Sequence, residues 1–243
     1  MAISIYLAAS PAQITKLERF PKKLAWMACH FSASSAGLSD CPQWLPPGSL
    51  LILDDSAPIQ GHDPDQIRRE LEDILSKFPC SALLLDFQRP GGEDMTLALA
   101  ELPCPVVVTE RYAHMTSGPV LLPPVPPYML PGKHLKPWAG RDIWLELSKD
   151  SCAIRLTKAG AELSEERPDV AGRHHHKELH CRYDIMLHSE EAIFRLHRTP
   201  EDFLSLLQES EALGVTTAVG LMQEFPEFGQ QKAALQCRAA LAN

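Results

Sequence analysis

The chain has 243 residues, of which 45% are hydrophobic and 22% are charged. This much apolar material can bury a large core, which excludes a chain that is disordered as a whole, and the length suits one α/β barrel or two small domains. The formal net charge of −8 provides no basic surface for a phosphate backbone, so we do not expect nucleic acid as a partner.

Two further properties concern the cellular setting. The first residues lack the basic start and apolar segment of a secretory signal, and no later run approaches the roughly 20 apolar residues that span a bilayer. We therefore expect a soluble, cytoplasmic protein without a membrane partner, and the oligomeric state stays open. The seven cysteines are scattered and form no CxxC pair, which predicts reduced, mostly buried thiols rather than a cysteine-based zinc site.

Three helices are predicted from a shared start signal. Residues 10–13, 63–66 and 199–202 each offer an N-cap side chain, a proline at the first helical position and a polar side chain two positions later. Apolar residues follow at helical spacing, and Gly214 is placed to end the third helix.

Short apolar runs between these helices predict eight strands. They lie at residues 3–8, 24–29, 50–53, 82–87, 106–109, 143–147, 193–196 and 217–221. A repeated strand-then-helix unit of this kind is typical of an α/β fold with parallel strands, and eight strands predict a (β/α)8, TIM-barrel-like protein. The connection after Thr109 lacks an obvious helix.

Two regions depart from this repeat. Residues 113–140 carry seven prolines, which predicts an extended loop that forms a wall of the pocket. Beyond residue 141 the pattern changes to two candidate β-hairpins, 143–147 with 152–157 and 181–187 with 192–197. We interpret residues 141–192 as an antiparallel β-hairpin insertion within a single barrel-like domain that spans residues 1–243.

The apolar run at residues 81–88 gives the clearest indication of a site. It ends in Asp86 and Gln88, just before the turn sequence Arg89-Pro90-Gly91-Gly92. An apolar run bounded by turn residues is typical of a strand that is buried on both faces of a parallel sheet. Barrels and open parallel sheets bind ligands beyond the carboxyl ends of their strands, so Asp86 and Gln88 are the first candidates for a binding site.

Other strand ends carry further polar groups that would converge on the same face of a barrel. Paired carboxylates can serve as general acid and base or as nucleophile and acid, and the candidates for such catalytic roles are Asp86, Glu146 and Glu224. Ligand contacts are expected from Asp54, Asp55, Gln88, Glu110, Tyr112 and Gln223. The ends of the predicted strands also hold His30, Arg111, His197 and Arg198. Any one of these groups could instead serve as a helix N-cap or an ion-pair partner.

Residues 81–88 resemble a degraded form of DxxDxDxE, the fourth-strand signature of family 18 glycoside hydrolases, which are the chitinases and their relatives. The four signature positions fall on Ser81, Leu84, Asp86 and Gln88, so one of the four matches. Gln88 stands where the family has the acid that protonates the glycosidic oxygen. The resemblance implies a (β/α)8 barrel with a sugar-binding groove, and often an α+β insertion late in the barrel, near residues 141–192.

A glutamine cannot donate a proton as a carboxylic acid does, so the resemblance favours a non-catalytic binder of a carbohydrate-type ligand, such as an oligosaccharide. Asp86 would orient ligand hydroxyls, and Gln88 would hydrogen-bond an amide or a hydroxyl. One alternative is an active glycoside hydrolase that uses other strand-end carboxylates, such as Glu146 or Glu224. Another is a protein-interaction scaffold that docks through the insertion.

Cofactor and metal sites are not expected. The sequence contains no GxGxxG after the first strand, no GxxxxGK[ST], no GxSxG and no HExxH. Residues 174–176 and His180 form a histidine cluster, but the polar segment 164–180 predicts a mobile surface loop without a scaffold to fix metal ligands.

Overall fold

The computed structural model describes residues 3–16, 21, 23–166 and 172–226. The chain divides into two compact units. We call the larger one the barrel unit, and its described residues lie in 4–123, 141–146 and 216–226. The smaller one is the insertion unit, and its described residues lie in 124–140 and 147–215, with Ile3. Leu17, which belongs to the first predicted helix, and Cys237 lie outside the described residues.

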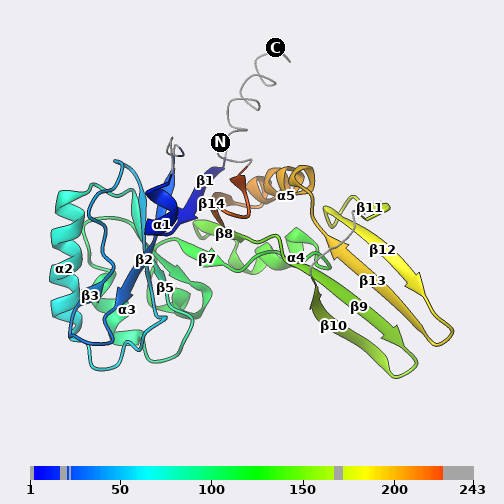
Figure 1. The fold of residues 1–243 in the computed structure, drawn as a ribbon, viewed down its shortest axis with the longest axis horizontal. Helices are drawn as coiled ribbons and strands as arrows, with labels where there is room; N and C mark the ends of the chain where they lie inside the picture. Colours follow the sequence, from blue (N-terminus) through cyan, green and yellow to red (C-terminus); the bar gives the residue numbers. More distant parts are fainter. Residues whose placement is uncertain (1–2, 17–20, 22, 167–171, 227–243) are drawn as a thin grey trace, which may run out of the picture. The chain divides into compact units, whose positions relative to one another are not determined.

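Eight parallel strands close into a barrel (Figure 1). Their order along the sheet is β1, β14, β8, β7, β6, β5, β4 and β2, and β1 also pairs with β2, which closes the ring. Their bounds are β1 Ser4–Ala9, β2 Leu24–Phe31, β4 Leu50–Asp54, β5 Ala82–Asp86, β6 Val106–Thr109, β7 Val120–Leu122, β8 Ile143–Leu147 and β14 Val215–Leu221. A short strand, β3 (Leu38–Ser39), pairs antiparallel with β2. The predicted (β/α)8-like fold is confirmed.

Helices follow most of the strands along the chain. They are α1 Pro11–Ile14, α2 Pro64–Lys77, α3 Glu93–Leu99, η1 Glu110–Met115, α4 Pro131–Leu135, η2 Lys136–Trp138 and α5 Pro200–Ala212. The three predicted start signals are confirmed, because Ser10 and Thr199 form capping boxes and Asp63 caps α2 through its side chain. In the described part of the chain, no helix is both long and apolar enough to cross a membrane.

The barrel sheet separates two apolar clusters. Alternate side chains of the strands fill the barrel interior, among them Ile52, Leu84 and Val107. The side chains between them belong to a second cluster with Ile67 and Leu71 of α2. This alternation explains why the strands are apolar on both faces, and it decides which side chains point inward at the strand ends.

Three predicted elements are wrong. The proline-rich region is not only a loop, because Val120–Leu122 forms barrel strand β7 between Val108 of β6 and Ile143 of β8. Residues 143–147 are therefore not a hairpin arm, since β8 pairs in parallel with β7. Residues 193–196 are not a barrel strand, because they lie in an antiparallel sheet of the insertion unit.

That sheet has five antiparallel strands in the order β10, β9, β13, β12 and β11. Their bounds are β9 Ser151–Thr157, β10 Gly160–Glu166, β11 His174–His176, β12 Cys181–Leu187 and β13 Glu191–His197. The predicted hairpin of 181–187 with 192–197 is confirmed, and the antiparallel insertion late in the chain is confirmed with it. Part of the predicted loop 164–180 is strand, because β10 runs to Glu166 and β11 covers residues 174–176.

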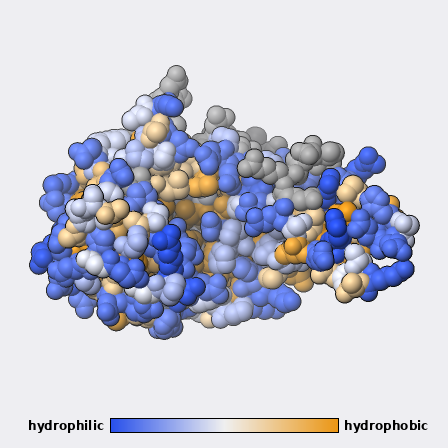
Figure 2. Space-filling view, turned by 60° about the horizontal axis from the view of Figure 1, so that its bottom comes forward, coloured by the Kyte–Doolittle hydropathy of each residue, from blue (hydrophilic) through white to orange (hydrophobic). Residues whose placement is uncertain are grey.

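One face of the insertion sheet carries an exposed set of apolar side chains, which we call the apolar face. Register places Leu163, Ile154, Phe194 and Ile185 side by side across four strands, followed by Ala161, Leu156, Ala192 and Leu187. Leu163 is 55% exposed and Leu187 is 77% exposed. Orange, hydrophobic residues reach the surface in this part of the chain (Figure 2). The opposite face alternates with it and carries Arg155, Arg195 and Asp184.

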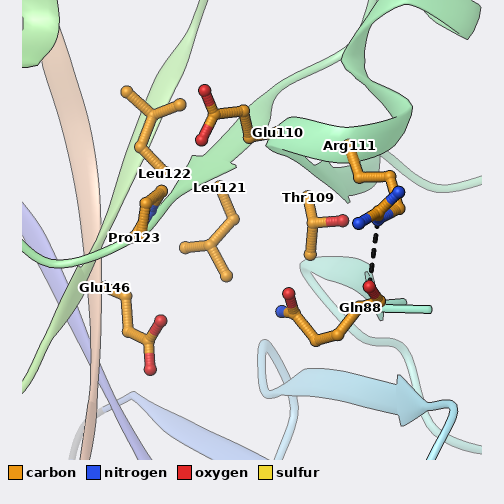
Figure 3. Close-up of a pocket in the computed structure, with 8 residues that line it drawn as sticks. All are labelled: Gln88, Thr109, Glu110, Arg111, Leu121, Leu122, Pro123 and Glu146. Carbon is orange, nitrogen blue, oxygen red and sulfur yellow. Dashed lines mark hydrogen bonds between the residues drawn. The ribbon is translucent and has the colours of Figure 1, made fainter.

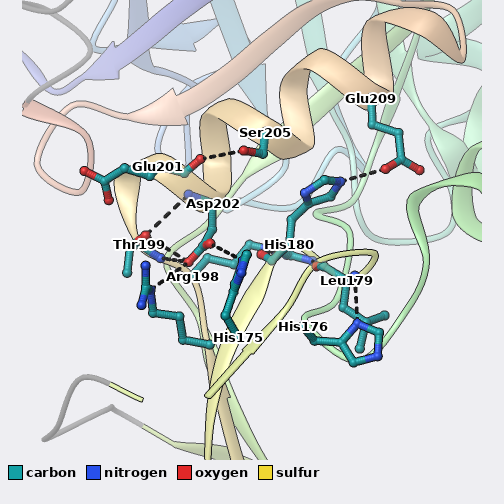
Figure 4. Close-up of polar contacts among 11 residues, drawn as sticks. His175, His176, Leu179, His180, Arg198, Thr199, Glu201, Asp202, Ser205 and Glu209 are labelled. Atoms are coloured by element: carbon teal, nitrogen blue, oxygen red, sulfur yellow. Dashed lines mark hydrogen bonds and ion pairs between the residues drawn. The ribbon is translucent and has the colours of Figure 1, made fainter. Parts of the chain in front are cut away.

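Helix α5 contacts this sheet through polar pairs at both of its ends (Figure 4). The carboxylate of Asp202, in the first turn of α5, accepts hydrogen bonds from the N–H and hydroxyl of Thr199 and pairs with His175 Nε2 at 3.1 Å. His180 Nε2 lies 2.6 Å from Glu209 Oε2 near the other end of the helix. The Arg198 guanidinium donates to four backbone carbonyls, those of Val125, Pro126, Leu179 and His180. Burial lowers the pKa of Arg198 to about 10.

Candidate functional site

A row of polar side chains crosses three neighbouring strands at the carboxyl end of the barrel. Register places His30 of β2 beside Asp54 of β4, and Asp54 beside Asp86 of β5. Asp54 and Asp86 continue the alternation of Ile52 and Leu84, which fill the interior, so both carboxylates face inward. The row therefore lies at the edge of the barrel where ligands of this fold bind.

The carboxylate of Asp54 is engaged on both oxygens. His30 Nδ1 lies 2.8 Å from Oδ2, and the backbone N–H of Ser56 donates to Oδ1 at 2.8 Å. The Ser56 hydroxyl is also within 3.3 Å of His30 Nδ1. These contacts fix the orientation of the Asp54 carboxylate at the carboxyl end of the barrel.

Asp86 and Gln88 form a second polar pair. Both follow the inward alternation of β5, and Gln88 Nε2 donates a hydrogen bond of 2.6 Å to Asp86 Oδ1. Burial raises the pKa of Asp86 above its usual range, against the opposing effect of this hydrogen bond, and the charges of Asp54 and Asp55 raise it further. Gln88 itself is exposed, so its amide can meet a ligand.

The segment 87–92, which follows β5, is pinned by side chains from neighbouring strands. Asp55 Oδ2 accepts hydrogen bonds from the backbone N–H groups of Gln88 and Arg89, at 3.1 and 2.7 Å. Thr109 Oγ1 donates to the Phe87 carbonyl at 2.7 Å. The Tyr112 hydroxyl accepts from the N–H of Gly92 and donates to the Arg89 carbonyl. Asp55 and Tyr112 are buried, at 5% and 1% exposure. They therefore contribute to the site by fixing the backbone of segment 87–92 rather than by facing a ligand.

A pocket of about 540 Å³ opens beside this segment (Figure 3). Its lining consists of Gln88, Thr109, Glu110, Arg111, Leu121, Leu122, Pro123 and Glu146. Gln88 and Glu146 project from different strands toward the same space, with Leu121 between them in this view. Arg111 Nε donates to the Gln88 carbonyl at 2.9 Å, which fixes the guanidinium at the pocket edge.

The structure brings together some of the predicted site residues and not others. Gln88, Glu110 and Glu146 line the pocket, and Asp86 adjoins it through Gln88. Gln223 and Glu224 follow β14 and are not part of this lining. Gln13 of α1 donates to Gln223 Oε1 at 3.1 Å.

His197 and Arg198 lie at the end of β13, a strand of the insertion sheet, and not at the end of a barrel strand as predicted. This correction follows from the reassignment of residues 193–196 to the insertion sheet. His197 Nε2 accepts from the N–H of Gly172 at 3.2 Å, and burial lowers its pKa.

The proline-rich region does supply a wall of the pocket, as predicted, but as a strand and its end rather than as a loop. Leu121, Leu122 and Pro123 belong to β7 and its end, inside the region predicted as a proline-rich loop. The apolar triplet 120–122 was the available signal, although it is short for a strand. Thr109 also lines the pocket. It was not predicted as a site residue, because its side chain is uncharged and the candidates were chosen mainly among charged residues at strand ends.

Three histidines of the cluster contact other side chains of the insertion unit. His175 pairs with Asp202, His180 pairs with Glu209, and the ring of His174 stacks on Tyr183 with centroids 5.2 Å apart. Within the described ranges, no three His, Cys, Asp or Glu side chains gather as metal ligands would.

No protein-family model matches the sequence, and no curated protein matches it. Solved structures do resemble the fold. The chitinase of Chromobacterium violaceum ATCC 12472 has a TM-score of 0.57 at 9% identity, over 92% of this chain and 95% of that one. A GH18 chitinase of Cycas revoluta, in complex with allosamidin, has a TM-score of 0.57 at 8% identity, over 89% and 94% of the two chains.

The spore cortex-lytic enzyme SleL of Bacillus cereus has a TM-score of 0.55 at 9% identity and covers 90% of this chain and 70% of its own. Such low identities establish likeness of fold alone. The predicted resemblance to family 18 is thereby confirmed at the level of the fold. The strand that carries Asp86 is the fourth of the eight barrel strands along the chain, the strand to which the family signature belongs.

We predict that Asp55→Ala destabilises the protein by about 2–4 kcal/mol, because the backbone N–H groups of Gln88 and Arg89 both lose their buried acceptor. Urea denaturation would measure this loss. Asp73→Ala is the matched control, since Asp73 is exposed and pairs with Lys77 on the same helix, and it should change stability by under about 0.5 kcal/mol. Equal effects of the two substitutions would contradict the pinning of segment 87–92.

Asp86→Asn is expected to raise the melting temperature at neutral pH. A carboxyl with a raised pKa in the folded state opposes folding while it is ionised, and this penalty disappears once the pH falls below its pKa in the unfolded chain. The gain should therefore shrink as the pH is lowered through the acidic range, in melting curves recorded across that range. A gain that is independent of pH would show that burial of the charge is not its cause.

Proposed function

We propose that the barrel binds a saccharide at the carboxyl ends of β5 to β8 and does not hydrolyse it. The observation that carries this proposal is the Asp86–Gln88 pair, joined at 2.6 Å beside the pocket on the fourth barrel strand. An amide at this position can accept from and donate to hydroxyls or an N-acetyl group, but it cannot supply the acidic proton that cleavage requires.

The surroundings of the pair suit recognition of a polar, uncharged ligand. Glu110, Glu146 and Arg111 supply hydrogen-bonding groups around the pocket, while Leu121 and Leu122 supply apolar surface for a sugar face. A pocket of about 540 Å³ is within the roughly 300–1,000 Å³ typical of small-molecule sites.

Two solved structures of one neighbour in fold support a chitin-type ligand. The Cycas revoluta chitinase is solved in complex with (GlcNAc)3, and a double mutant of it that includes a glutamate-to-glutamine substitution is solved with (GlcNAc)4. A barrel of this fold in which a glutamate is replaced by glutamine thus holds an oligosaccharide.

The alternative of an active hydrolase has less support from the site. Asp54 is engaged by His30 and Ser56, and Asp55 is engaged by the backbone of segment 87–92. Glu110 and Glu146 line the pocket together with the Gln88 amide, which cannot act as the acid.

Titration calorimetry with (GlcNAc)4 and with a gluco-oligosaccharide of equal length tests the proposal. We expect the wild type to bind at least one of them and Asp86→Ala to bind about tenfold or more weakly, because a charge-assisted hydrogen bond is lost. Asp73→Ala, on the exposed face of α2, should bind as the wild type does.

Product analysis of the same mixtures separates binder from enzyme. Binding without cleavage supports the proposal, cleavage by the wild type would establish the hydrolase instead, and no binding to either sugar would refute a saccharide function. Gln88→Glu restores an acid beside Asp86, so cleavage by this variant alone would show that the missing acid limits the site.

We infer a second candidate function from the apolar face, namely self-association through the insertion sheet. Leu156, Leu163, Ile185 and Leu187 are 40–77% exposed, and register places them together with their neighbours in two adjacent rows. Exposed apolar side chains that lie together mark interaction surfaces, so we expect a weak dimer of two such faces. A second copy suits this face because sheets pack face to face through matching apolar rows.

Sedimentation equilibrium over a range of protein concentrations tests this association. The wild type should dimerise with rising concentration, and the double substitution Leu163→Glu and Leu187→Glu should remain monomeric. Leu97→Glu, at a 50% exposed position on α3 of the barrel unit, is the matched control and should behave as the wild type. A wild type that stays monomeric at every concentration would refute the inference.

A further inference from the structure

Two cysteines of the barrel unit lie in direct contact. Cys29 Sγ of β2 and Cys41 Sγ, two residues after β3, are 3.8 Å apart. Cys29 is fully buried and Cys41 is half-buried, so one sulfur of the pair can be reached from solvent. Both are free thiols.

Local structure holds the two sulfurs together. The pairing of β2 with β3 sets His30 beside Ser39, and Asp40 then adopts a left-handed conformation with φ of 52°. The Trp26 indole N–H donates to the Asp40 carbonyl at 3.1 Å and fixes this turn. The turn brings Cys41 back over Cys29.

The contact also makes the two thiols unequal. The hydrogen bond from Cys29 lowers the pKa of Cys41, whereas the same contact and burial raise the pKa of Cys29. Asp54, Glu70 and Asp40 surround the pair and oppose thiolate formation, so the contact with Cys29 is what favours the Cys41 thiolate.

We propose that Cys29 and Cys41 form a dithiol site that reacts with low-molecular-weight disulfides and closes to an intramolecular disulfide. The Cys41 thiolate, having lost its proton to solvent, attacks one sulfur of the disulfide and releases a thiolate. The Cys29 thiol then attacks Cys41 Sγ, and its proton passes to the second leaving thiolate. The protein loses two electrons and two protons, and one small disulfide becomes two thiols.

Three other cysteines have less reactive surroundings. Burial raises the pKa of Cys80 and of Cys181 to about 11 in each case, and burial also raises the pKa of Cys104. The Cys29–Cys41 contact therefore predicts the site of first reaction.

The experiment treats the full-length protein with glutathione disulfide and maps the peptides by mass spectrometry without reduction. We expect the protein to lose two hydrogen atoms, a cross-link between the peptides of Cys29 and Cys41, and a higher melting temperature that dithiothreitol reverses. Glutathione retained on another cysteine, or no cross-link between these two peptides, would overturn the proposal.

Variants assign the two roles. Cys29→Ser should retain a glutathione on Cys41, because no second thiol resolves the mixed disulfide, and Cys41→Ser should show neither product. Cys104→Ser is the control and should form the same cross-link as the wild type. A Cys29→Ser protein that gains no glutathione at Cys41 would contradict the role of Cys41 as the attacking thiol.

Discussion

The buried carboxylate of Asp55 is the constraint on which the site depends. The chain leaves β5 with two backbone N–H groups that no strand can pair, and Asp55 of the neighbouring strand end accepts both. Thr109 and Tyr112 satisfy carbonyl groups of the same segment from the other side. With its backbone fixed by neighbours on both sides, the segment presents Asp86 and Gln88 inward without help from a ligand.

Sequence analysis predicted several helix starts and strands correctly because their signals are local. The capping boxes at Ser10 and Thr199 and the apolar run at residues 82–87 each report on a few consecutive residues whose structure does not depend on distant partners. The polar end of that run likewise placed Asp86 at the carboxyl end of a barrel strand, whereas the direction of its side chain depends on the register of the strand and follows only from the structure.

The errors arose where the partner of a strand decides its role. Residues 143–147 and 193–196 are both short apolar runs, and nothing in their own residues distinguishes a parallel barrel strand from an arm of an antiparallel sheet. Strand β7 is only three residues long and is flanked by prolines, so the sequence predicted an extended loop where Leu121 and Leu122 form the pocket wall as part of a strand. Asp55 and Tyr112 were recognised as polar groups at strand ends, but their use as backbone acceptors and donors is visible only in three dimensions.

The placement of the insertion along the chain has a consequence for folding kinetics. Strands β8 and β14 are neighbours in the barrel sheet, yet residues 148–214 lie between them in sequence. Bringing the ends of so long a segment together costs chain entropy that falls sharply once the segment itself becomes compact. The pairing of β8 with β14, which closes the barrel, should therefore form after the insertion sheet and α5 have folded. Folding of the insertion is then an early event on the pathway to the closed barrel.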